Sequence, residues 1–320
     1  MQGGVKLGVV MDPIDSIKVD KDSTFAMLLE AQARGWELWY MEPSDLALCD
    51  GQVQGRVRRL RVEDSPDRWF ELDRPRRAGL DELDVLLMRK DPPVDMQYIY
   101  TTYLLDLVEK SGVVVVNRPQ GLRDVNEKVF VTHFPRCTPP TLVTSSISQI
   151  RDFLHEQERI VVKPLDGMGG ASVFRLAGGD PNTNVVLETL TLNGRRSVMA
   201  QRFIDAIDTS GDKRILLIDG VAVPHALARI PAPGESRGNL AAGARGVGAE
   251  VSERELWICH QVGPVLREKG LIFAGLDLIG DYLTEINVTS PTCIRELDRT
   301  YSTNISARLL DCVEARLIAR

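Results

Sequence analysis

Residues 160–176, IVVKPLDGMGGASVFRL, constrain the fold of this chain more than any other segment. A β-branched run ends on Lys163, a glycine-rich turn follows, and a second apolar run begins at Val173. Two apolar runs joined by a glycine-bearing loop predict a β-hairpin. Because glycine has no Cβ, successive backbone N–H groups can turn toward one point and bind phosphate oxygens. Lys163 would place a compact positive charge beside that loop.

Two familiar phosphate-binding loops do not fit this segment. No Lys-Ser or Lys-Thr pair follows the glycines, as a Walker A loop requires, and the glycines lead into a strand rather than a helix. A flexible turn without a ligand is therefore an equally good interpretation of the segment alone. The rest of the chain has to decide between the two.

Length and composition narrow the class of protein. A chain of 320 residues has room for two or three domains, and its net charge of -6 gives no reason to expect nucleic acid or an anionic membrane as a partner. No apolar run is long enough to cross a bilayer, and the first residues enter a strand pattern without signal-peptide features. Five widely spaced cysteines without a CxxC motif predict free thiols in a reducing cytoplasm, and four scattered histidines argue against zinc.

The first third of the chain alternates strand and helix patterns. Strands are expected over residues 5–11, 37–41, 84–88 and 113–116, with helices starting at a Ser23 cap and spanning residues 96–110. This alternation predicts βαβ units and a mostly parallel sheet, hence an α/β fold. The polar, arginine-rich residues 50–80 are expected to leave this pattern as a surface excursion such as an antiparallel hairpin.

Ligands of open parallel sheets collect at the carboxyl ends of the strands. Two such ends carry polar residues, over 11–16 and 88–93, and Arg89 in the second could bind a carboxylate through two hydrogen bonds. An Asp-Pro turn and a solvated basic pair explain the same residues equally well.

A second lysine precedes the glycine hairpin. Asp124 or Asn126 could start a short helix that carries Lys128, which matters only if Lys128 and Lys163 face the same nucleotide. An amphipathic helix is expected over residues 145–158 and a strand over 197–204. The backbone of that strand could bind an adenine edge, although many strands could do the same.

A basic segment follows a hairpin turning at Asp219-Gly220. Residues 230–248 show little regular pattern and are expected to form a long loop carrying Arg237 and Arg245, with Arg214 and Arg229 on the preceding strands. A mobile, arginine-bearing flap can close over a phosphoryl group and exclude water. The alternative is a solvated flexible loop.

The region after a Ser252–Glu255 capping box carries the acids. Residues 271–288, LIFAGLDLIGDYLTEINV, read as two strands with a turn near Gly280. A three-residue loop pairs Asp277 with Glu285 and leaves the leucines on one apolar face, so we predict this register over a two-residue loop. Asp277, Glu285 and Asn287 then share a face and offer the hard oxygen ligands that suit Mg²⁺ bound with phosphates.

Several segments together resemble the prokaryotic glutathione synthetase family of the ATP-grasp superfamily. They are MDPIDSI, MRKDPP, NEK, VKPLDGMGGASVFR, GDKR, ARIP, RGNLAAG, GLDLIGD and LTEINVTSPTCIRE, between residue 5 and about residue 315. The loop before Gly211 is a residue longer than the family form, and residues 50–80 diverge from it. The resemblance implies a pre-ATP-grasp α/β domain over 1–125 and a two-lobed α+β ATP-grasp domain over 126–204 and 205–320.

The resemblance also implies an activity and a set of site residues. The expected reaction is ATP-dependent ligation of γ-glutamylcysteine to glycine through an acyl phosphate, with two Mg²⁺ ions that Mn²⁺ can replace, in a cytoplasmic homotetramer. ATP would be bound by Lys128, Lys163, Gly167, Gly169, Gly170 and Gln201, and the metal by Asp277, Glu285 and Asn287. The catalytic arginines would be Arg214, Arg229 and Arg245, and the peptide substrate and lid would involve Ser16, Arg89, Arg237, Ser290, Pro291 and Thr292.

Two other functions are compatible with the sequence. One is another carboxylate–amine ligase of the same superfamily, which substrate preference would reveal. The other is an ATP-binding module without catalysis, which would need neither a full acid set nor a basic lid.

Overall fold

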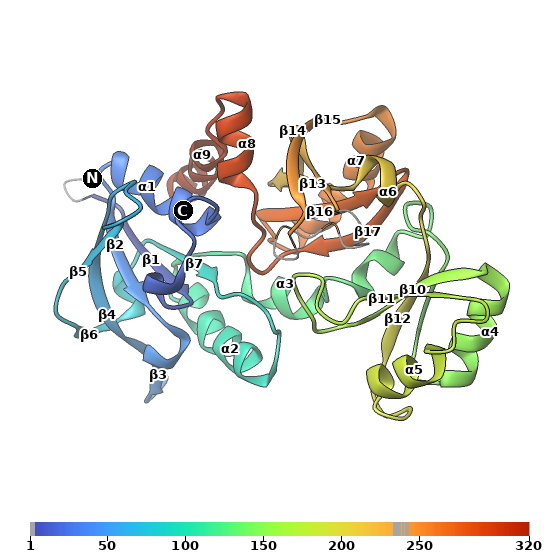
Figure 1. The fold of residues 1–320 in the computed structure, drawn as a ribbon. Helices are drawn as coiled ribbons and strands as arrows, with labels where there is room; N and C mark the ends of the chain where they lie inside the picture. The colour runs from blue at the N-terminus through green and yellow to red at the C-terminus, as the bar shows by residue number, and fades with distance from the viewer. Residues whose placement is uncertain (1–3, 233–237, 239, 241–242, 320) are drawn as a thin grey trace.

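The computed structural model describes residues 4–232, 238, 240 and 243–319, and the strands of these residues form three sheets (Figure 1). An eight-stranded sheet lies at the N-terminal end, a four-stranded sheet in the middle of the chain and a five-stranded sheet after it. Within the described residues, no helix combines the length and apolar character needed to cross a membrane.

The N-terminal sheet has a parallel centre, as predicted. Its parallel strands are β1 (Lys6–Met11), β2 (Glu37–Met41), β7 (Val85–Arg89) and β8 (Val114–Val116), in the order β2-β1-β7-β8. The predicted antiparallel excursion extends the same sheet through β3 (Leu46–Cys49), β4 (Gln52–Val62), β5 (Phe70–Leu72) and β6 (Arg76–Gly79). Short 3-10 helices η1 (Ile14–Ser16), η2 (Pro43–Asp45) and η3 (Leu80–Glu82) occupy its connections.

The two predicted helices of this domain are present, with one error at a cap. They are α1 (Ser23–Ala33) and α2 (Met96–Lys110). The predicted Ser23 cap is wrong, because the Asp22 carboxylate accepts the hydrogen bond from the Phe25 N–H, at 2.6 Å. The Ser23 hydroxyl instead accepts the backbone N–H of Ile294. A carboxylate at this position caps as well as a hydroxyl, so sequence alone could not choose between neighbours.

The middle sheet contains the predicted glycine hairpin. Strands β10 (Arg159–Pro164) and β11 (Phe174–Ala177) pair antiparallel, with Ile160 opposite Leu176. The sheet continues through β12 (Val198–Arg202) to β9 (Thr141–Thr144). Helices α4 (Ile147–Gln157) and α5 (Thr183–Thr191) cover it (Figure 1) and contribute to a separate apolar core with Ile150 and Leu187.

The third sheet has the order β15-β14-β13-β16-β17. Its strands are β13 (Asp212–Ile218), β14 (Val221–Ile230), β15 (Arg245–Glu250), β16 (Phe273–Ile279) and β17 (Tyr282–Asn287). Helix α7 (Glu253–Glu268) begins with the predicted Ser252–Glu255 capping box. The irregular loop predicted over residues 230–248 is too long, because Arg245 begins β15 and pairs with Ile230.

The chain returns to the N-terminal domain at its end. Helices α8 (Ile294–Tyr301) and α9 (Ile305–Ile318) lie against α1 (Figure 1), and Leu297 and Leu309 join the core formed by Phe25 and the first strands. The connections between the sheets include α3 (Pro119–Asp124), η4 (Val129–His133) and α6 (Ile207–Ser210). The strand ends of the N-terminal sheet, the glycine hairpin and the acidic hairpin β16–β17 are thereby held in one structure.

Candidate active site

The acidic hairpin has the predicted pairing but not the predicted turn. Gly275 lies opposite Asn287 and Asp277 opposite Glu285, as the apolar pattern required. The three-residue loop is wrong, because Ile279 pairs with Tyr282 across a two-residue Gly280-Asp281 turn. The register shifts between Asp277 and Leu278, and Thr284 is the extra residue of a β-bulge. A tight turn and one bulge together give the same arrangement of acids as a longer turn.

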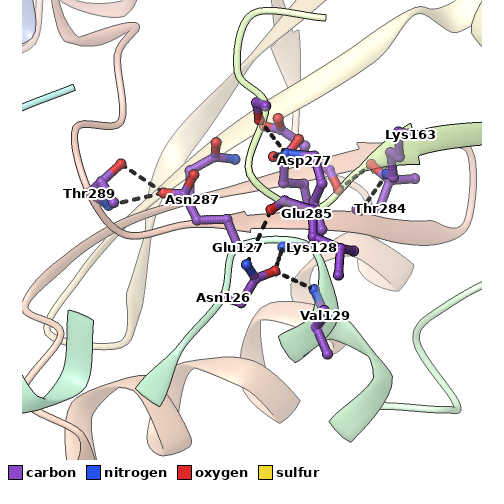
Figure 2. Close-up of polar contacts among 12 residues, drawn as sticks. Asn126, Glu127, Lys128, Val129, Lys163, Asp277, Thr284, Glu285, Asn287 and Thr289 are labelled. Atoms are coloured by element: carbon purple, nitrogen blue, oxygen red, sulfur yellow. Dashed lines mark hydrogen bonds and ion pairs between the residues drawn. The ribbon is translucent and has the colours of Figure 1, made fainter. Parts of the chain in front are cut away.

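The bulge at Thr284 connects this hairpin to Lys163, the lysine that precedes the glycine loop. The Thr284 hydroxyl donates to the carbonyl of Asp277 at 3.1 Å, and the Lys163 ammonium donates to the carbonyl of Thr284 at 3.1 Å (Figure 2). Lys163 is only 8% exposed. Burial lowers its pKa, with the nearby acids opposing that effect.

Lys128 connects the same hairpin to the glycine loop. Its ammonium donates to the carbonyl of Gly167 at 2.6 Å and to Glu285 Oε1 at 2.8 Å. Asn126 Oδ1 accepts the backbone N–H groups of Lys128 and Val129 (Figure 2). The predicted start of the helix is wrong, because Lys128 itself occupies the cap position of η4 and therefore precedes this short helix. Both lysines therefore contact the acidic hairpin. Their binding of one nucleotide stays a prediction.

A first cavity, here called the lysine cavity, lies between the glycine loop and these lysines, with about 830 Å³ not filled by protein atoms when space open to solvent is included. Gly169 and Gly170 have φ values of +63° and +79°, which favour glycine and let the loop curl over this space. Apolar Val161, Phe203 and Ile204 line its other side. All six residues predicted to bind ATP line it: Lys128, Lys163, Gly167, Gly169, Gly170 and Gln201.

A second cavity, here called the arginine cavity, adjoins the first and has about 760 Å³ not filled by protein atoms when space open to solvent is included. The two cavities share Met168, Gly169 and Glu285. The predicted site residues that line the arginine cavity are Arg214, Arg229, Asp277, Glu285, Asn287, Ser290, Pro291 and Thr292. The structure thus brings two predicted groups of ligand-binding residues to neighbouring spaces with one glutamate between them.

Buried charges of both signs organise the arginine cavity. Asp277 is 2% exposed and accepts hydrogen bonds from Arg214 Nε and Nη2, at 2.5 and 2.9 Å, while Arg229 Nη2 lies 3.0 Å from Asp277 Oδ2. Burial alone would raise the pKa of Asp277, but the two guanidinium groups outweigh it and hold the pKa well below its usual range. Asp277 is therefore ionised at neutral pH even though it is buried.

Two acids of this site, Glu127 and the buried Asp212, were not predicted from the sequence. Glu127 Oε1 accepts hydrogen bonds from the N–H group and the hydroxyl of Thr289 (Figure 2) and from the N–H group of Val288. Burial next to Glu285 raises the pKa of Glu127. Asp212 lines the lysine cavity and lies 2.6 Å from Arg229 Nη2. Their only sequence signal was adjacency, because Glu127 precedes Lys128 and Asp212 lies two residues before Arg214.

Asp212 should make the stability of the protein depend on pH. Burial, reinforced by Asp277, raises its pKa from 3.8 to about 6. Between these values the folded state keeps a proton that the unfolded state has lost, so the contribution of Asp212 to the free energy of unfolding falls as pH rises. We expect the difference between wild type and Asp212→Asn to decrease by roughly 1–3 kcal/mol from about pH 4 to about pH 7, measured by urea unfolding. A difference that grows with pH would contradict this.

Among the described residues, three predicted site residues line neither cavity: Ser16, Arg89 and Arg245. Ser16 is exposed and donates to the Pro13 carbonyl, and Arg245 is exposed at the start of β15. Arg89 is buried and donates to the carbonyl of Pro291 at 3.0 Å. It therefore contacts a residue that lines the arginine cavity without lining the cavity itself. Arg237 lies outside the described residues. The ligand-binding roles of all four stay predictions.

The chain matches two protein-family models, one for each part of the molecule. The family model for the prokaryotic glutathione synthetase N-terminal domain matches residues 5–123, and that for the prokaryotic glutathione synthetase ATP-grasp domain matches residues 127–302. The glutathione synthetase of Pseudomonas syringae pv. tomato is 58% identical over 316 residues, covering 99% of both chains. That of Escherichia coli O127:H6 is 55% identical over 313 residues, covering 98% of this chain and 99% of the relative.

Solved structures at low identity show the same fold. D-cycloserine synthetase superposes with a TM-score of 0.68 at 17% identity, covering 98% of this chain and 99% of the other. The ATP-grasp ligase PsnB, in complex with a minimal precursor, Mg and ADP, gives a TM-score of 0.62 at 17% identity over 98% of each chain. The predicted two-lobed ATP-grasp domain behind an N-terminal α/β domain is confirmed, and the chain belongs to the prokaryotic glutathione synthetase family.

Proposed function

We propose that this protein joins γ-glutamylcysteine to glycine, with conversion of ATP to ADP and phosphate. The observation that carries the proposal is the meeting of the lysine and arginine cavities at Glu285 under the glycine loop. One space suits a nucleotide polyphosphate and the other suits a carboxylate that must react with its terminal phosphate. Membership of the family supports the same assignment.

The lysine cavity would hold ATP. Lys128 and Lys163 would bind its phosphates through charge-assisted hydrogen bonds, which are the stronger ones. The glycine loop would cover the phosphates with backbone groups, and Val161, Phe203 and Ile204 offer apolar surface for the adenine. Gln201, on β12, lies at this end of the cavity and donates to Thr141 Oγ1 at 3.1 Å.

The arginine cavity would hold the peptide at the reacting carboxylate. A cysteinyl carboxylate oxygen would attack the γ-phosphorus of ATP, the bond to ADP would break, and an acyl phosphate would form. The glycine amine would then attack the acyl carbon and displace phosphate, with loss of a proton from the amine. Arg214 and Arg229 are buried where they could stabilise the transferring phosphoryl group and the tetrahedral oxyanion.

The acids of the hairpin fit a divalent cation. Asp277, Glu285 and Asn287 all line the arginine cavity, and two carboxylates with one amide oxygen are the hard donors that Mg²⁺ takes when phosphates supply the rest. Bound Mg²⁺, or Mn²⁺ in its place, would offset the negative charge of the phosphoryl group during transfer. Before ligands bind, Arg214 and Lys128 neutralise the two acids, which explains how like charges can face each other across the strands.

The assay that tests the proposal measures ADP release. We expect release only when γ-glutamylcysteine, glycine and Mg²⁺ are present together, with glutathione formed in equal amount. A preference for D-alanine or glutamate over glycine would assign the protein to another ligase of the superfamily. ATP binding without ADP release under any of these conditions would leave only a nucleotide-binding module.

Lys163→Met should separate nucleotide binding from stability. A methionine of similar length fills the same space but cannot bind phosphate, so the KM for ATP should rise about 10- to 100-fold, the loss expected for one charge-assisted hydrogen bond. The free energy of unfolding should stay equal or increase, because the variant no longer buries an ammonium whose pKa burial lowers. Lys269→Met, which removes an ammonium from a more exposed pair with Asp124, is the control and should leave the KM unchanged. An unchanged KM in Lys163→Met would contradict the role of Lys163.

The cysteines support a reducing cellular compartment. All five cysteines are free thiols, and Cys137, Cys259 and Cys293 are buried, which suits a reducing compartment such as the cytoplasm. The family resemblance further supports a homotetramer, which a light-scattering measurement of the molar mass of the purified protein would test.

A further inference from the structure

The peptide groups at the end of β17 are bound by side chains from two other segments. Asn117 Nδ2 donates to the carbonyl of Val288 at 2.7 Å, and Glu127 Oε1 accepts the N–H of the same residue at 2.8 Å. Neither side chain belongs to the acidic hairpin. Both come from the connection between the N-terminal sheet and the middle sheet, ten residues apart in sequence.

Asn117 also binds the other strand of the hairpin. Its side chain donates to the carbonyl of Phe273 at 2.6 Å and accepts the N–H of Phe273 at 2.9 Å. Phe273 begins β16 and Val288 directly follows β17. One buried amide, 3% exposed, therefore holds the open end of the hairpin whose middle carries Asp277 and Glu285.

Glu127 extends the same contact toward the substrate-side segment. Beyond Val288, its Oε1 accepts the N–H of Thr289 at 3.0 Å and the Thr289 hydroxyl at 2.9 Å. The residues on either side, Asn287 and Ser290, line the arginine cavity. Three hydrogen bonds to one oxygen fix the position of residues 288–289, because a single hydrogen bond would still allow this segment to rotate.

We propose that Asn117 and Glu127 are positioning residues, which form a clamp on Val288 and Thr289 and so aim Asn287 at the metal and Ser290 at the peptide substrate. This rests on the function proposed above and adds the residues that orient its ligands. Groups that orient metal ligands typically change affinity or activity by about 10- to 100-fold when they are removed. The clamp acts through backbone hydrogen bonds, so it requires an acceptor at Glu127 rather than a charge.

Glu127→Ala and Glu127→Gln separate an acceptor from a charge. Glutamine keeps a side-chain oxygen for the Val288 and Thr289 N–H groups, whereas alanine removes it. We expect Glu127→Ala to raise the Mg²⁺ concentration for half-maximal activity and the KM for γ-glutamylcysteine about 10- to 100-fold, with Glu127→Gln within about fivefold of wild type. Binding of ADP without metal, measured by calorimetry, should change by less than about threefold in both, because Lys128 and Lys163 remain.

Asn117→Ala tests the other half of the clamp and has a matched control. Gln32 likewise binds both the N–H and the carbonyl of one strand residue, Val62, at 2.9 and 2.6 Å, but on the outer part of the N-terminal sheet. Asn117→Ala and Gln32→Ala should both lower the melting temperature, whereas only Asn117→Ala should raise the two substrate-side constants. Equal constants in both variants would reduce Asn117 to a structural role and overturn the proposal.

Amide hydrogen exchange gives a readout that does not depend on ligase activity. The Val288 and Thr289 amides should exchange faster in Glu127→Ala and stay protected in Glu127→Gln. If Glu127→Gln loses activity as fully as Glu127→Ala while these amides remain protected, Glu127 acts through its charge and the clamp is wrong. If wild-type protein makes no glutathione, the proposed function fails, while exchange and the Mn²⁺ affinity of the ADP complex still decide whether the clamp positions Asn287.

Discussion

Replacing Glu285 by glutamine is expected to reduce kcat by about 10³-fold or more while leaving the fold intact. Glu285 lines both cavities, so it lies where a nucleotide phosphate and a peptide carboxylate would meet. Glutamine preserves shape and an oxygen for the Lys128 ammonium, now at 2.8 Å from Oε1. It removes the negative charge that a divalent cation needs, and such a cation supplies several kcal/mol of transition-state stabilisation. Each tenfold change in rate corresponds to about 1.4 kcal/mol, so losing this stabilisation explains the expected fall in kcat.

The measurement is ADP release under saturating substrates, with circular dichroism and thermal unfolding to verify the fold. The matched control is Glu255→Gln, because Glu255 also pairs with a lysine, Lys213, at 2.9 Å, but it is buried and caps α7 instead of lining a cavity. The control should retain turnover and lose some stability. Glu285→Gln should lose turnover and keep its stability. Full activity in Glu285→Gln would refute a metal-binding role and remove the main support for the proposed chemistry.

The sequence predicted which residues face each other across the acidic hairpin, but not the turn and the bulge that produce this pairing. Apolar alternation favoured Asp277 opposite Glu285, because the alternative register would place Glu285 and Asn287 on the same face as the leucines. The turn could not be obtained in this way, since a two-residue turn with a bulge at Thr284 and a three-residue turn give the same facing residues. The bulge matters for function because its carbonyl receives Lys163.

Residues that act through backbone contacts were the ones missed. Glu127 and Asn117 bind peptide groups of Val288, more than 150 residues away, and no local pattern marks such a contact. Asp212 is similar, because its burial depends on three strands of the third sheet coming together. By contrast, glycine turns, helix caps and strand alternation are local, and the predictions drawn from them were right to within a residue or two, as Asp22 in place of Ser23 illustrates.

The second large effect is expected for Asp277→Asn, which should lose turnover like Glu285→Gln but also lose stability. Asp277 is bound by Arg214 and Arg229, and asparagine leaves two buried guanidinium groups with Asp212 as their remaining carboxylate partner. Removing one partner of a buried ion pair costs about 3–5 kcal/mol, because the other charge stays buried without compensation. Urea unfolding followed by tryptophan fluorescence would measure this loss at about pH 7.

The pH dependence of that loss distinguishes a buried ion pair from a packing defect. The folded-state pKa of Asp277 lies below its unfolded value of about 3.9, so its contribution is complete above about pH 4 and disappears as pH falls through the folded pKa. The stability gap between wild type and Asp277→Asn should therefore narrow in acid. A double variant, Arg214→Leu with Asp277→Leu, should recover stability relative to Asp277→Asn without recovering turnover, because two apolar side chains leave one buried charge fewer. A gap that is constant from about pH 7 to about pH 3, or a double variant less stable than the single one, would show that the charges around Asp277 do not govern its stability.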